Sequence, residues 1–230
     1  MEIDIKYLFE PPELTKQVLL TIQPLAPLSM VNSMPGSYYK TEHAPDKYML
    51  CGLFENNLNL HLSEDDRNAI RKKIKNYYKK KYKLNYELIN SAVGYKPIIN
   101  HLFEIESPPN LPDMKFYEDV WTQHLIGSDE RHLRGVINND WRIENDMCGL
   151  KGIDNTQERN AYFNSNRDKF PRFYRSPQQR EYLITNGEYF FKLNMTASLF
   201  TILDFVIKEN NVGYLGTSEG WVHISIGELL

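Results

Sequence analysis

The sequence predicts an α+β protein whose elements follow the order strand, helix, strand, strand, helix, strand. Three observations lead to this class. Short apolar runs bounded by turn residues lie near both ends of the chain. Two segments begin with an N-cap residue or a proline and continue with apolar residues at helical spacing. The dipeptide Asn186-Gly187, a strong signal for a β-hairpin, separates two strand-like runs.

The first strand and the first helix are predicted within residues 17–58. The run QVLLTIQ at residues 17–23 is short, apolar and bounded by Pro24 and Pro27, as is typical of a buried strand. A loop rich in turn residues follows at 29–44. Pro45 then stands where a helix can begin, and apolar residues recur on one helical face at Leu50, Leu53, Phe54 and Leu58.

A further helix is predicted after Ser63, an N-cap residue followed by three acidic residues in the first turn. Its apolar stripe is narrow and consists of Ile70, Ile74 and Tyr77 or Tyr78. The lysines lie on the other faces. Residues 67–83 contain nine basic residues and no acidic one, and because the whole chain has a net charge of −3, the rest of it carries −12. One strongly cationic segment therefore stands on an acidic protein.

The C-terminal part predicts the remaining elements. Around Asn186-Gly187, residues 180–185 and 188–193 are expected to pair as a hairpin inside the main sheet. Thr196 caps a helix that ends near residues 210–211, and residues 221–226 alternate as a half-buried strand does. The resulting βαββαβ order is that of ferredoxin-like domains. We therefore expect a single domain in which residues 63–178 form a helical and irregular insertion between the first helix and the central hairpin, and we place no elements within 84–177.

Composition narrows the class of protein further. The chain has neither the apolar run of a membrane span nor the basic start of a signal peptide, so we expect a cytoplasmic protein. Its two cysteines, Cys51 and Cys148, are far apart, which argues against a disulfide framework or a structural zinc site. His124, Asp129 and His132 lack the spacing of a metal site. We expect no cofactor and no metal.

Two segments resemble a known family. Residues 43–56 (HAPDKYMLCGLFEN) contain a proline and, a few residues later, an apolar-Gly-apolar-apolar-Glu helix after the first strand. Residues 213–222 (GYLGTSEGWV) contain a Tyr-Leu-Gly turn that leads into the last strand. In this order the two motifs resemble the Cas-five family, the RAMP-type CRISPR-associated subunit of type I Cascade complexes, over about residues 15–62 and 172–226.

The resemblance implies a RAMP/RRM-like fold and a guide-RNA-binding structural subunit that caps the 5′ handle of the crRNA. The partners it implies are the crRNA and the backbone and large subunits of a Cascade-type complex, with target DNA as a further candidate. Most members are not enzymes. One branch cleaves repeat RNA without a metal, using a tyrosine, a lysine and a histidine, and no segment of this chain aligns with the lysine-histidine pair of that branch.

Three groups of residues are candidates for RNA contact. The loop mixes hydroxyl, amide, aromatic and cationic side chains, which suits a single-stranded RNA end. Lysines over several helical turns suit phosphate neutralisation, and a basic-aromatic patch precedes the predicted hairpin. An ordinary surface loop and a solvated helix face are the alternatives. The candidates are Ser29, Asn32, Tyr38, Tyr39, Lys40, His43 and Lys47 in the loop, Arg71, Lys72, Lys75 and Lys79 in the helix, and Arg172 and Arg175 in the patch.

Two other functions remain open. The first is a metal-independent endoribonuclease that processes pre-crRNA, in which His43, Tyr38 and Lys40 would be catalytic because an imidazole can take the 2′-hydroxyl proton and cations can stabilise the phosphorane. The second is a protein-interaction module unrelated to RNA, in which the cationic helix binds an acidic partner.

Overall fold

The structure, a computed structural model, describes residues 5–33, 38–92, 94–121, 126–127, 157–158, 161, 165, 172–173, 178–217 and 219–229. The chain divides into two compact units. The first consists of Met1–Asp119 and Gln179–Leu230, and the second of Val120–Gln178. Within the range 63–178, residues 63–119 belong to the first unit and residues 120–178 to the second.

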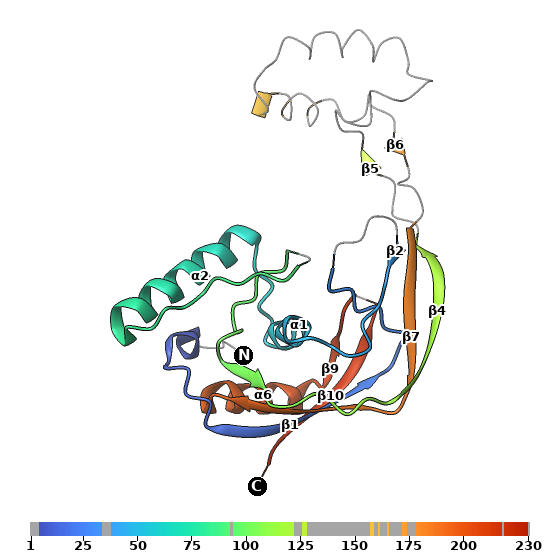
Figure 1. The fold of residues 1–230 in the computed structure, drawn as a ribbon. Helices are drawn as coiled ribbons and strands as arrows, with labels where there is room; N and C mark the ends of the chain where they lie inside the picture. Colours follow the sequence, from blue (N-terminus) through green and yellow to red (C-terminus); the bar gives the residue numbers. More distant parts are fainter. Residues whose placement is uncertain are drawn as a thin grey trace. The chain divides into compact units, whose positions relative to one another are not determined.

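A five-stranded antiparallel sheet forms the centre of the first unit (Figure 1). Its strand order is β3-β8-β1-β10-β9. In the middle of the sheet, Leu20 lies opposite Phe191 on one side and Ile226 on the other. The strands are β1 (Lys16–Pro24), β3 (Phe103–Ile105), β8 (Tyr189–Met195), β9 (Val212–Tyr214) and β10 (Trp221–Glu228). The first and last predicted strands are confirmed.

Helices α1 (Lys47–Asn57) and α6 (Ala197–Glu209) lie on one side of this sheet (Figure 1). The Asp46 carboxylate accepts a 2.8 Å hydrogen bond from the Met49 amide at the start of α1, and the Thr196 hydroxyl caps α6. Both predicted helices are confirmed, although α1 begins two residues after Pro45. The core consists of apolar side chains from both layers, including Val18, Leu20, Ile22, Leu50, Leu53, Phe54, Leu199 and Leu203.

The cationic helix is also confirmed as α2 (Glu64–Tyr77), with the Ser63 hydroxyl accepting a hydrogen bond from the Asp66 amide at 3.1 Å. It continues as a π-helical turn, η2 (Tyr78–Tyr82), and ends at Lys83, whose φ is +59°. Ile74 and Tyr78 are buried on its inner face, as the apolar stripe predicts. A short 3₁₀ helix, η1 (Ile5–Phe9), contacts α2.

The predicted hairpin is wrong, although both of its strands exist. Strand β7 (Gln178–Asn186) pairs with β2 (Tyr38–Tyr39) and β4 (Asp113–Trp121) in a separate three-stranded sheet of order β2-β7-β4. Strand β8 already has β1 and β3 as its two neighbours. Of the two turn residues only Gly187 has a positive φ, +120°, whereas a two-residue type I′ turn needs both. The chain therefore passes from one sheet to the other at this point.

The sequence pattern predicts neither β9, whose residues it assigns to a turn, nor β3. Strand β3 lies at one edge of the main sheet. It is three residues long and pairs with β8, with Glu104 opposite Asn194. In the second unit, β5 (Ile126–Gly127) pairs with β6 (Arg172–Phe173). Within the described part of the chain, no helix is long and apolar enough to cross a membrane.

Candidate nucleic-acid interface

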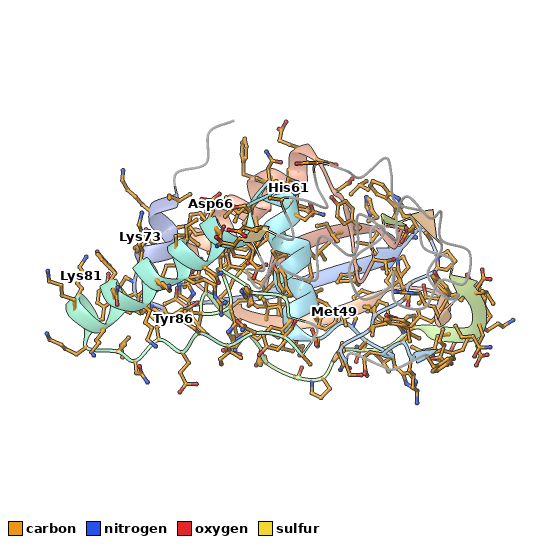
Figure 2. All side chains as sticks on the ribbon, turned by 90° about the horizontal axis from the view of Figure 1, so that it is seen from above. Met49, His61, Asp66, Lys73, Lys81 and Tyr86 are labelled. Carbon is orange, nitrogen blue, oxygen red and sulfur yellow. The ribbon has the colours of Figure 1, made fainter. Side chains whose placement is uncertain are left out.

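The outer side of α2 and η2 carries a group of lysines that we call the lysine face. Figure 2 shows Lys73 on α2 and Lys81 on η2, with Lys81 at the end remote from α1. Among the described residues, no carboxylate forms an ion pair with any member of the face. All members are exposed except Lys75, which is half-buried. The lysine face consists of Lys72, Lys73, Lys75, Lys79, Lys80, Lys81 and Lys83.

Aromatic side chains hold the end of this face in place. The hydroxyl of Tyr78 donates to the carbonyl of Glu10, and that of Tyr82 donates to the carbonyl of Phe9 at 3.2 Å. The Lys81 ammonium donates to the Tyr77 hydroxyl at 2.6 Å, and this contact lowers the pKa of Tyr77. These contacts anchor the π-helical turn to η1 and the residue after it. Its lysines remain exposed.

Arg71 is not part of the lysine face, although it was a candidate. Its side chain is buried and donates to the Asn90 side chain at 2.8 Å and to the carbonyl of Ile89 at 2.5 Å. Arg67 likewise points inward and forms an ion pair with the buried Glu55. Both arginines hold neighbouring segments against α2.

The candidate loop residues have divided roles. Ser29 is buried and accepts a 3.4 Å hydrogen bond from Arg180, whose guanidinium also lies 4.7 Å from the centre of the Tyr39 ring. The Tyr38 hydroxyl donates to Glu118 at 3.1 Å. Desolvation, followed by the contacts with Glu118 and Glu181, raises the pKa of Tyr38 to about 12.

The remaining loop candidates are placed as follows. Asn32 lines a groove described below, and Lys40 is exposed. The His43 ring lies 5.0 Å from that of Phe116. Lys47 forms a 2.6 Å ion pair with Glu104. Within the described residues, no hydrogen bond or ring contact joins His43 to Tyr38 or Lys40; Tyr38 binds Glu118 and His43 contacts Phe116.

The third candidate group lies in the second unit. Arg172 belongs to β6, where it is paired with Gly127, and its side chain is outside the described residues. Arg175 lies outside them altogether, as do His124, Asp129 and His132. Within the described residues, no group of three histidine, cysteine, aspartate or glutamate side chains could hold a metal ion.

A groove runs along the exposed side of α1, between the turn after β9 and the segments that flank α2. It consists of two hollows with volumes of about 660 Å³ and 230 Å³. Met49, Gly52, Tyr95 and Gly216 line both hollows. In Figure 2, Met49 and His61 mark the region of α1 near its two ends. Further lining residues are Val31, Asn32, Asp46, Tyr48, Glu55, Asn56, His61, Ser63, Arg67, Ser91, Tyr214 and Thr217.

A buried carboxylate supports the floor of this groove. Glu55 is 2% exposed and pairs with Arg67. It accepts hydrogen bonds from the Tyr95 hydroxyl at 2.7 Å and from the backbone amides of Ile98 and Ile99 at 2.6 Å and 3.2 Å. A buried charge is stable only when it is paired and hydrogen-bonded. The partners that Glu55 needs come from α2 and from the segment 95–99, so its interactions join these two to α1.

The turn after β9 closes the groove on its other side. Gly216 has a φ of +76°, and a Cβ atom at this position would lie 2.4 Å from the Ser29 carbonyl oxygen. Only glycine fits such a conformation and such a close backbone approach. Leu215, directly before it, is buried. The turn is thereby fixed against Ser29 and Met30, at the start of the loop that follows β1.

A comparison with protein families decides the affiliation of the chain. The sequence profile of the family described as CRISPR-associated protein Cas5p matches residues 3–226. The chain belongs to the Cas5p family. No curated protein matches the chain.

The two motifs of Cas5p resemblance therefore have distinct places in the structure. The apolar-Gly-apolar-apolar-Glu segment forms α1, where Gly52 lies at the groove and Glu55 beneath it. The Tyr-Leu-Gly segment forms the turn that faces them. Sequence reasoning missed the groove residues Asn56, His61 and Thr217. The sequence feature that could have indicated a groove beside this helix is Gly52, a glycine in the middle of α1.

Proposed function

We propose that this Cas5p-family chain is a guide-RNA-binding structural subunit of a type I Cascade complex, where it caps the 5′ handle of the crRNA. The observation that carries the proposal is the family match over residues 3–226. The lysine face supports the RNA contact, because exposed cations without acidic partners bind phosphates and release counterions.

The core is proposed to be a ferredoxin-like, RAMP/RRM-like domain. The order of four strands in the main sheet, β3-β8-β1-β10, supports this interpretation. With β3 as the second strand and β8 as the third, the elements β1, α1, β3, β8, α6 and β10 give a βαββαβ order. The single RAMP-like domain then carries an insertion between β3 and β8, and this insertion includes the second compact unit.

The candidate residues take complementary parts in the proposal. Lys72, Lys75 and Lys79 contact the phosphates, since they are the predicted lysines that lie on the lysine face. Lys40 and His43 are exposed at the loop and remain proposed RNA contacts. Arg172 and Arg175 remain proposed contacts of the second unit. Ser29, Tyr38, Tyr39, Lys47 and Arg71 hold these groups in place through their protein contacts.

The proposal implies a cytoplasmic assembly with the crRNA and with the backbone and large subunits. The test is to express the tagged chain with its neighbouring genes, purify the complex and sequence the bound RNA. We expect RNA of uniform length with a common 5′ end, together with other subunits. Recovery of an acidic protein without RNA would contradict the proposal and favour the protein-interaction module.

A further inference from the structure

Gly52 stands in the interior of α1, where glycine destabilises a helix relative to other residues. Packing does not require it. A Cβ atom at Gly52 would meet only the Tyr95 ring carbon and hydroxyl at 4.0 Å, which is an ordinary contact distance. At Gly213, Gly216 and Gly220, by contrast, an added Cβ would lie within 2.6 Å, 2.4 Å and 2.3 Å of another atom. The missing side chain of Gly52 leaves open space in the groove.

The open space lies where the two hollows meet. Because Gly52 lines both of them, together with Met49, Tyr95 and Gly216, the two hollows of about 660 Å³ and 230 Å³ are neighbours that share part of their lining. The larger hollow alone is within the range of small-ligand sites. A longer side chain at Gly52 would extend into this junction.

The charged groups of the groove are already paired. Glu55 and Arg67 bind each other, and Asp46 accepts the hydrogen bond that caps α1. A phosphate in the groove would therefore find no lysine or arginine without a carboxylate partner among the described lining residues. An uncharged ligand therefore suits the groove better than a phosphate does.

Several polar side chains of the groove have hydrogen-bonding capacity that no described residue uses. The side chains of Asn32, Asn56 and His61 make no hydrogen bond within the described part of the chain, and the buried Thr217 hydroxyl oxygen has no partner there. Amide, imidazole and hydroxyl groups offer both donors and acceptors. The rings of Tyr48 and Tyr214 add aromatic surface.

We propose that this groove binds one unpaired nucleobase of the RNA that the chain holds. The inference rests on the proposed function. Lysine contacts with phosphates position a strand but do not read its sequence. An unstacked base in single-stranded RNA is recognised by aromatic surfaces and by hydrogen bonds to its edges, which the groove supplies. The groove would then select a base while the lysine face holds the backbone.

The test compares two probes on the full chain by fluorescence anisotropy: a labelled single-stranded RNA of mixed sequence, and an abasic ribose-phosphate oligomer of equal length. We expect the wild type to prefer the RNA by about tenfold, because stacking one base on an aromatic surface is worth about a factor of ten or more. Gly52→Gln should abolish this preference. It should not lower the melting temperature, because glutamine favours a helix more than glycine does.

The matched control is Gly227→Gln on β10, where an added Cβ also meets nothing within 4 Å. It should keep the preference for RNA. If Gly52→Gln keeps it too, the base site is refuted while RNA binding, and with it the proposed function, stands. If the wild type binds neither probe at low salt, both proposals fail. If Gly52→Gln prefers RNA as before but no longer co-purifies with partner subunits, the groove holds a protein side chain and the inference is overturned.

Discussion

The carboxylate of Glu55 and the hydroxyl of Tyr95 form a 2.7 Å hydrogen bond beneath the groove of α1. Arg67 lies on the other side of this contact, 5.3 Å from the centre of the Tyr95 ring and paired with Glu55. The buried proton on Tyr95 is held firmly, since burial and the nearby carboxylate raise the pKa of Tyr95. A single acidic residue on α1 thus contacts both α2 and the segment 95–99.

We expect Glu55→Gln to destabilise the protein by about 3 kcal/mol, because the half-buried Arg67 would lose its charged partner. Urea unfolding followed by circular dichroism measures the change. The matched control is Glu64→Gln, which removes an exposed carboxylate that pairs with Lys96. It should change the midpoint little, since exposed ion pairs stabilise weakly. Equal midpoints for both variants would show that Glu55 does not hold the helices together.

The sequence predicts the helices and the central strands because their signals are local. Ser63 and Thr196 are hydrogen-bonding caps, and the alternation around Val222 and Ile224 is the direct result of one buried sheet face. The pairing partners were not predictable in the same way. Asn186-Gly187 marks a change of direction, but whether β7 meets β8 depends on which strands already occupy the edges of β8. Strand β3 has three residues, too few for a periodic pattern.

The candidate site was predictable in part for a related reason. Charge is visible in sequence, so the lysines of α2 were found. The sequence does not show whether a side chain points into the protein or toward solvent. Arg71 is therefore predicted to lie with the lysines, although its side chain binds Asn90. The groove combines residues from segments as distant as Asn32 and Thr217, and only the fold brings them together.

We expect Gly216→Ala to destabilise the protein by about 3 kcal/mol, since its φ of +76° and the Ser29 carbonyl oxygen at 2.4 Å both oppose a side chain. Thermal unfolding measures the effect. Gly227→Ala is the control, because it has open space around it and no positive φ. Equal melting temperatures for Gly216→Ala and Gly227→Ala would contradict the conclusion that the turn at Gly216 requires glycine.

Stability should fall as the pH is lowered from about 6.5 to 4, in part because of His101. Burial lowers its pKa from 6.5 to about 4, so between these values the unfolded chain binds the proton and the folded protein does not. The neutral ring contributes its full stabilisation above pH 6.5 and loses up to about 3 kcal/mol by pH 4. Urea midpoints across this range measure it, and His101→Gln should flatten the curve. An unchanged curve would rule out His101 as the cause.

The purified chain should not cleave a labelled hairpin of the CRISPR repeat in EDTA. The Tyr38 phenol is held by Glu118 and has a pKa of about 12, so it stays protonated at neutral pH. His43 packs against Phe116. Gel analysis over time, with buffer alone as the reference, checks this. Cleavage that is lost in His43→Ala and kept in His223→Ala would instead support the endoribonuclease.

The lysine face should account for much of the salt dependence of RNA binding. Replacing Lys72, Lys75 and Lys79 by alanine should weaken binding and flatten the plot of log affinity against log salt by roughly 0.7 for each lysine that no longer binds a phosphate. Sequence preference should stay the same, because phosphate contacts do not specify bases. The control replaces three lysines that already form 2.6 Å ion pairs, Lys16 with Glu228, Lys96 with Glu64 and Lys208 with Asp204. Both variants lose the same net charge. If the salt dependence came from a long-range effect of charge, the slope of log affinity against log salt would therefore change equally in both. A flattened slope in the first variant alone would place the phosphates on the lysine face of α2 and η2. A wild-type slope and affinity in that variant would leave the loop of Lys40 and His43 as the remaining candidate.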